Sequence, residues 1–138
     1  MSRKKIKFEH PPILIGDRAM QLYKLQPNGS EQAEMVYVLV STQDYEVLKE
    51  TYGSSEVKTD WQTHVHDEKG FYYFLNWYNF TYESSLPNAV KIKNKLVVDK
   101  QTLLFMILFP AFDKKNKITR NMAKKHLQDT MTMANSFI

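Results

Sequence analysis

The stretch that decides the fold is FYYFLNWYNFTY, which occupies residues 71–82. It follows the polar turn DEKG at 67–70, and a strand-like segment at 57–66 precedes that turn, so we expect two long antiparallel strands. Alternate side chains of a strand point to opposite faces. One face then carries Tyr72, Phe74, Tyr78, Phe80 and Tyr82, and the other carries Phe71, Tyr73, Leu75 and Trp77. One set should fill the core, while the other needs a helix, a ligand or a partner.

The segments around these strands predict a mixed sheet. Residues 19–25 and 34–40 flank a turn-rich stretch in which Asn28 and Gly29 favour a hairpin. Both faces of the segment 34–40 are apolar, which is typical of a central strand. A further strand is expected over 89–98, because apolar residues and lysines alternate there.

A short helix is expected after the first hairpin. Ser41 followed by Asp44 resembles a capping box at a helix N-terminus. Apolar residues then recur at helical spacing up to Gly53, at Tyr45, Leu48 and Tyr52.

In the final third of the chain, residues 103–109 can be interpreted as a helix or as a buried strand. Asp99 can cap a helix that runs through 103–109 and ends at Pro110, although a buried strand fits this apolar run almost as well. From Thr119 onward, apolar and basic residues separate at helical spacing, which predicts an amphipathic C-terminal helix.

The sequence therefore predicts an α+β fold in a single domain, residues 1–138. We expect a mixed or antiparallel sheet of about five strands and one or two C-terminal helices, in the order β-β-α-β-β-β-α-α. A chain of 138 residues with 43% hydrophobic and 25% charged residues is typical of one globular domain. Residues 1–12 are expected to form a basic N-terminal arm, and residues 113–138 a basic loop followed by the amphipathic helix.

Composition excludes several classes of function. Without cysteine the chain has no disulfide, thiolate zinc site or cysteine nucleophile. This fits either the reducing cytosol or a protein that is indifferent to redox conditions, and we expect a cytoplasmic protein. The longest apolar run, 103–109, has seven residues, against about 20 for a bilayer span, and no apolar stretch follows the basic start, so we expect neither a membrane partner nor a signal peptide. No glycine-rich phosphate loop, Gly-x-Ser-x-Gly elbow or His-Glu-x-x-His helix occurs, so we expect no enzyme and no cofactor.

Positive charge is concentrated in three segments. Residues 1–10, 91–100 and 113–126 carry net charges of +3, +3 and +5, so the rest of this +4 chain sums to −7. In the segment 113–126 the basic residues lie at the start of the predicted C-terminal helix, where positive charge opposes the helix dipole. Contact with phosphate groups would explain their position. The plain alternative is a solvated face that promotes solubility. The leading expectation is contact with a nucleic-acid backbone through Arg3, Lys4, Lys91, Lys93, Lys114, Lys115, Lys117, Arg120, Lys124 and Lys125.

The segment 69–75, KGFYYFL, resembles the RNP1 strand of RNA recognition motifs, whose exposed rings stack on bases. Lys69, Gly70, Phe71 and Tyr73 match that pattern, whereas Tyr72 stands where the family has a small residue. The strand's own pattern points the same way, because an aromatic face that no helix covers is either a stacking platform for bases or a subunit interface. Tyr73 and Trp77 are the rings that we expect to stack on bases.

The runner-up function is a protein–protein adaptor or assembly subunit of the kind found in phages and mobile elements, with a homo-oligomer as one form. The expected stacking or interface residues are Phe71, Tyr73, Trp77, Met122, Met131 and Met133, because methionines adapt to irregular interfaces.

The third function rests on His64-Val65-His66. This segment resembles the His-hydrophobe-His motif of rolling-circle replication and transposition nucleases, in which two histidines hold a divalent cation. That family also needs a tyrosine nucleophile, which is often followed three residues later by a lysine, and no such tyrosine–lysine pair follows His66. If the turn 67–70 keeps simple register, both histidines share the face of Phe71 and Tyr73. They are candidate metal ligands, and the plain alternative places them on the polar face of a half-buried strand.

Overall fold

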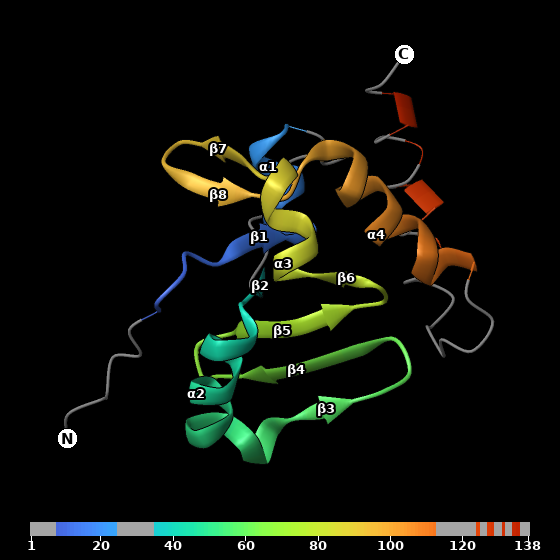
Figure 1. Ribbon diagram of the computed structural model, residues 1–138. Helices are drawn as coiled ribbons and strands as arrows, with labels where there is room; N and C mark the ends of the chain where they lie inside the picture. Colours follow the sequence, from blue (N-terminus) through green and yellow to red (C-terminus); the bar gives the residue numbers. More distant parts are fainter. Residues whose placement is uncertain are drawn as a thin grey trace.

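The computed structural model describes residues 8–24 and 35–112, with the side chains of 109–112 excepted, and six separate positions, Lys124, Leu127, Gln128, Met131, Ala134 and Asn135. These residues form an α+β fold with one eight-stranded mixed sheet (Figure 1). The strands are β1 (Ile13–Ile15), β2 (Val36–Leu39), β3 (Val57–Lys58), β4 (Gln62–His66), β5 (Phe71–Trp77), β6 (Phe80–Thr81), β7 (Val90–Ile92) and β8 (Lys95–Val97). The helices are α1 (Gly16–Leu22), α2 (Thr42–Tyr52), α3 (Tyr82–Ser85) and α4 (Lys100–Phe112), with 3₁₀ turns at Gly53–Ser55 and Leu86–Asn88. The predicted α+β class is confirmed.

The aromatic strand β5 lies inside the sheet, whose order is β3-β4-β5-β2-β1-β8-β7, with β6 also paired to β5. It runs parallel to β2 and antiparallel to β4. On the other side of β2, strand β1 is antiparallel to β2 and parallel to β8. Segment 34–40 therefore supplies a central strand, as its two apolar faces predicted.

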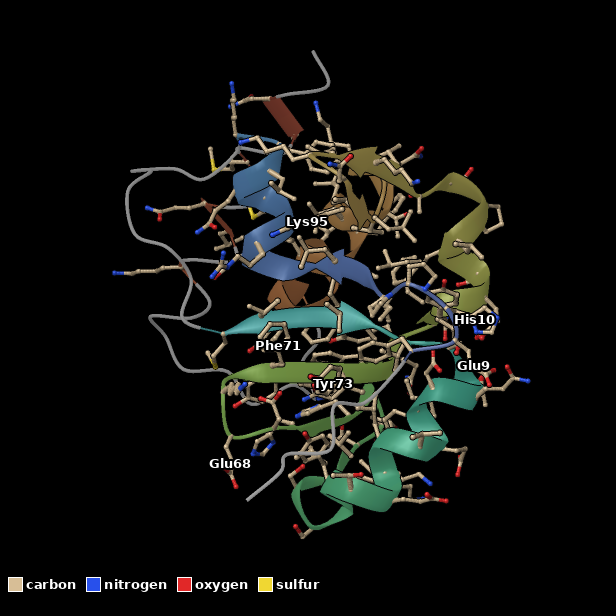
Figure 2. All side chains as sticks on the ribbon, turned by 90° about the vertical axis from the view of Figure 1, so that its left-hand side faces the viewer. Glu9, His10, Glu68, Phe71, Tyr73 and Lys95 are labelled. Atoms are coloured by element: carbon tan, nitrogen blue, oxygen red, sulfur yellow. The ribbon has the colours of Figure 1, made fainter. Side chains whose placement is uncertain are left out.

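Helices cover both faces of the sheet. On the face that we call the α2 face, the Tyr52 ring of α2 stacks on the Tyr73 ring of β5 at 6.3 Å between centroids. On the opposite face, the α4 face, the Trp77 indole N–H donates to the Met106 carbonyl of α4 at 3.0 Å. Figure 2 looks onto the α2 face, with α4 behind the strands. The core lies on both sides of the sheet and includes Leu14, Val38, Val65 and Tyr73 on one face and Ile13, Leu39 and Phe74 on the other.

Both predicted helix caps are present. The Ser41 hydroxyl accepts the Asp44 N–H at 3.2 Å, and the Asp99 carboxylate accepts the Thr102 N–H at 3.2 Å. These contacts satisfy amides that a helix N-terminus leaves free. Residues 103–109 are therefore helical, and α4 continues beyond the predicted stop at Pro110. The predicted helix from Thr119 lies mostly outside the described residues, although the six described positions there are helical.

The first predicted hairpin is wrong in its first strand. Residues 16–22 form α1, which buries Ala19 and Met20, and the strand that pairs with β2 is β1. Gly16 makes this change of direction possible, because its φ is +69° and a Cβ there would lie 3.1 Å from Cδ2 of Tyr37. The Asn28-Gly29 turn falls outside the described residues.

Three predicted long strands are each broken by a turn. Segment 57–66 divides into β3 and β4, and segment 71–82 divides at Tyr78, whose φ is +52°. Segment 89–98 is the hairpin β7–β8, because Lys93 and Asn94 both adopt positive φ, at +51° and +65°. Positive φ is uncommon outside glycine, and alternation of side chains does not reveal it.

A bulge in β5 changes which side chains share a face. Thr63 pairs with Asn76 but His64 pairs with Phe74, so Leu75 is the extra residue. Trp77 therefore shares the α4 face with Phe74, at 5.4 Å between ring centroids, and not the face of Phe71 and Tyr73 as expected.

The expected position of the two histidines is wrong, because the turn between β4 and β5 has a different register from the one predicted. Asp67 pairs with Phe71 around a three-residue turn that ends at Gly70, with φ +94°. The Asp67 carboxylate accepts the N–H groups of Lys69 and Phe71 at 2.8 and 3.0 Å, which holds this register. His64 and His66 consequently lie on the face of Tyr72 and Phe74.

Candidate nucleic-acid interface

Three lysines project from the β7–β8 hairpin, residues 90–97, which we call the lysine hairpin. Lys91, Lys93 and Lys95 are all exposed. Lys91 pairs with Leu96, and Ile92 pairs with Lys95, so Lys91 and Lys95 point to opposite faces while Lys93 lies in the turn. β7 is the last strand of the sheet, and Figure 1 shows the hairpin at the end away from β3.

The fold separates charge between the two ends of the sheet. Residues 35–85 contain eight acidic and three basic residues, a net charge of −5, and they form α2, α3 and strands β2 to β6. Residues 86–108 contain four lysines and a single acid, Asp99, whose carboxylate caps α4. Salt bridges in the described parts of the chain join Lys49 to Glu56 and, when its ring is protonated, His10 to Asp44. None of them neutralises a hairpin lysine.

Lys100 lies at the base of the lysine hairpin against α1. Its ammonium is 5.7 Å from the centroid of the Tyr23 ring, a distance at which the ring attracts a cation. The Tyr23 hydroxyl donates to the Val98 carbonyl at 2.7 Å. Burial, with a smaller contribution from the Asp99 charge, raises the pKa of Tyr23 to about 12, so this ring stays neutral and keeps its hydrogen bond.

The turn of the lysine hairpin yields a stability prediction. Two-residue hairpin turns with positive φ favour asparagine and glycine, so lysine at the first turn position is unfavourable. We expect Lys93→Asn to raise the free energy of unfolding by about 0.5 to 1 kcal/mol, measured by urea denaturation. A lower stability in the variant would contradict this account of the turn.

The structure places only some of the expected phosphate-binding residues. Lys91 and Lys93 come together on one hairpin, and Lys124 is helical and exposed. The remaining candidates, Arg3, Lys4, Lys114, Lys115, Lys117, Arg120 and Lys125, lie outside the described residues. The structure adds Lys95, which the alternation of lysines at 91, 93 and 95 could have indicated.

The expected stacking residues do not form one platform. Phe71 and Tyr73 lie together on the α2 face, with ring centroids 6.2 Å apart, whereas Trp77 lies on the α4 face. Tyr73 is only 9% exposed, and its hydroxyl donates to the Asp67 carboxylate at 3.0 Å. Burial and this hydrogen bond raise the pKa of Tyr73. Among the expected methionines Met131 is 66% exposed, while Met122 and Met133 are outside the described residues.

The two histidines lie in an aromatic cluster. The His64 ring is 4.7 Å from the Phe74 ring, and the His66 ring stacks on Tyr72 at 5.0 Å. Both Nδ1 atoms are buried without a hydrogen-bond partner, and within the described residues no group of three metal-binding side chains includes them. Two ligands alone are fewer than the three protein ligands of a typical catalytic zinc site, so the described geometry gives little support to a metal centre.

Burial of His64 makes stability depend on pH. Burial, and then the nearby His66, lowers the pKa of His64 from 6.5 to about 4. Between these values the unfolded chain binds a proton that the folded chain excludes, so the stabilisation is complete above pH 6.5 and falls as the pH drops towards 4. We expect a loss of up to about 3 kcal/mol across this interval, measured by urea denaturation. His64→Phe should flatten the curve between pH 6.5 and 5, and equal slopes for both proteins would contradict the assignment.

Comparison with protein-family models, with curated proteins and with solved structures finds no match to this chain. No helix in the described segments is long and apolar enough to cross a membrane.

Proposed function

We propose that this chain is a non-enzymatic protein that binds the backbone of a nucleic acid, with Lys91 and Lys93 of the lysine hairpin as its best-placed contacts. The observation that supports this most is the separation of charge. Lys91, Lys93 and Lys95 are exposed at one end of the sheet and form no salt bridge with the acids of the described residues, while the other end carries a net charge of −5. Lysine ammonium groups bind phosphates and release counterions, which supplies affinity without reading sequence.

The shape of the hairpin suits this role. A two-stranded ribbon at the edge of a sheet is narrow enough for the major groove of a duplex. The side chain of Lys93 lies at the tip of the hairpin, where nothing in the described structure requires a lysine. Its backbone has an unfavourable positive φ, and such strain is found most often at functional sites. The basic residues of 1–10 and 113–126 extend the same proposal, because they carry most of the remaining positive charge.

The aromatic rings of β5 are not included in the proposed contact with nucleic acid. Phe71 and Tyr73 lie beside Asp67, and Glu68 follows in the same turn. Phosphate groups would be repelled there, so bases are not expected to stack on this face. Contact with the backbone alone should show little preference for base sequence.

The experiment that tests the proposal compares two variants of equal net charge. Fluorescence anisotropy measures binding of labelled single-stranded and duplex oligonucleotides at 50 mM salt. The test variant is Lys91→Glu with Lys93→Glu, and the control is Lys58→Glu with Lys69→Glu, two exposed lysines of the acidic end. We expect the test variant to bind at least about tenfold more weakly and the control to change less than about threefold. Equal losses, or no binding by the wild type, would contradict the proposal.

A protein–protein adaptor is the second candidate, and one observation favours it. Phe71 is 38% exposed on the α2 face, where the Tyr73 ring contacts both Phe8 and Tyr52. An exposed ring among acids suits a cationic protein surface better than a nucleic acid.

A further inference from the structure

The α2 face carries charge of opposite sign at its two ends. Figure 2 shows Lys95 above Phe71 and Tyr73, and Glu68 below them. Strand pairing supports this view, because Tyr73 pairs with Val38, Val38 with Leu14, and Leu14 with Val97, two residues after Lys95. β5 and β8 are three strand spacings apart, about 14 Å, and the turn that holds Asp67 and Glu68 lies at the end of β5.

Part of this face is not covered by any of the helices and strands that the structure describes. The N-terminal segment and α2 cover its centre, since Phe8 and Tyr52 contact the Tyr73 ring and Leu14 and Val38 are buried. Phe71 and Val90 remain 38% and 39% exposed, and their strand positions put them on the same face. The uncovered part of the α2 face therefore carries two apolar side chains, Phe71 and Val90. Lys95 lies towards one end of it, and Asp67 and Glu68 lie at the other end.

We infer that the α2 face binds a second copy of this chain across a two-fold axis. Charge complementarity identifies this occupant. A rotation of 180° about an axis that lies between the two faces, perpendicular to the line from Lys95 to Glu68, places Lys95 of each copy opposite Glu68 of the other. The Phe71 rings then meet near the axis. Such an interface is self-complementary and closes at a dimer.

The inference goes beyond the proposed function and uses different side chains. Lys91 points to the α4 face and Lys93 lies at the tip, whereas Lys95 points to the α2 face. A dimer would therefore leave Lys91 and Lys93 free for phosphate and would double their number in one particle. Exposed ion pairs are weak and screened by salt, so we expect a dimer that dissociates as salt rises.

Charge exchange at two positions tests the inference. Sedimentation equilibrium at 50 and 500 mM salt measures the association of the wild type, Lys95→Glu, Glu68→Lys and the double variant. We expect the dimer dissociation constant of each single variant to rise at least about tenfold at low salt, because like charges then face each other twice. A 1:1 mixture of the single variants and the double variant should both regain dimerisation, since every pair is again of opposite sign.

Controls separate this result from other causes. Lys91→Glu makes the same charge change as Lys95→Glu on the same hairpin but on the α4 face, and it should dimerise like the wild type. Phe71→Ala should weaken the dimer of the otherwise unchanged chain. A wild type that is monomeric at the highest concentration, a mixture that fails to regain dimerisation, or mass that grows beyond the dimer would each overturn the inference. Oligonucleotide binding by Lys95→Glu shows separately whether the proposed function stands.

Discussion

Replacement of Phe74 by alanine is expected to lower the free energy of unfolding by about 3 to 5 kcal/mol. Phe74 is 1% exposed and lies on β5, between β4 and β2. Its ring contacts those of Tyr37, His64 and Trp77, at centroid distances of 5.2, 4.7 and 5.4 Å. Removal of the ring leaves a cavity among three aromatic neighbours that cannot close without moving the sheet.

Phe71 provides a matched control on the same strand. It is 38% exposed, so Phe71→Ala should cost only about 1 kcal/mol, and urea denaturation measures both variants. If Phe74→Ala is unfolded without denaturant, Phe74→Leu and Phe71→Leu keep the comparison available, and the larger loss is expected at Phe74 because only that position is buried. Similar losses for Phe71→Ala and Phe74→Ala would contradict the burial that the bulged register gives to β5.

Replacement of Asp44 by alanine is expected to lower the free energy of unfolding by at least about 3 kcal/mol. The Asp44 carboxylate is 3% exposed and accepts the N–H groups of Glu9 and His10, at 3.0 and 3.1 Å. Hydrogen bonds to a charged acceptor contribute about 1.5 to 3 kcal/mol each, and both are lost together. The carboxylate also lies in the first turn of α2, where the helix dipole favours negative charge.

Hydrogen exchange identifies the cause of the Asp44 effect. We expect the amides of Glu9 and His10 to lose protection in Asp44→Ala, because this side chain holds the N-terminal segment against α2. Ser41→Ala is the control, since it removes the cap of the same helix at a cost of about 1 kcal/mol and leaves those two hydrogen bonds in place. Equal costs for the two variants, with both amides still protected, would contradict the proposed role of Asp44.

The parts of the fold that were predicted correctly depend on local contacts. Ser41 and Asp99 cap their helices through side chains that reach a backbone N–H three residues away, and short-range spacing reveals such caps. One feature of the Ser41 cap was not foreseen. The resemblance to a capping box assigned Asp44 to its own helix, but its carboxylate binds backbone 34 and 35 residues earlier in the chain. No local pattern reports a contact over that distance.

The errors in the predicted strands have a common physical origin. Alternation of side chains describes a strand only while its register continues, and single residues at Leu75, Tyr78 and Lys93 interrupt it. Two of these three adopt positive φ without being glycine, so composition gives no warning. The interruptions also moved Trp77 away from Phe71 and Tyr73, which is why the expected stacking surface could not be assembled from the sequence. The concentration of positive charge on the lysine hairpin, in contrast, could be predicted, because Lys91, Lys93 and Lys95 lie close together in the sequence.

The measurement that tests the central claim most directly is the salt dependence of oligonucleotide binding by the wild type and by Lys91→Ala with Lys93→Ala. The logarithm of the association constant, plotted against the logarithm of salt concentration, has a slope of about −0.9 for each phosphate neutralised on a duplex. If both lysines contact phosphates, the slope of the variant should be shallower by about 1.8. Wild-type binding that does not depend on salt, or the same slope for both proteins, would contradict the lysine hairpin as the contact with the backbone.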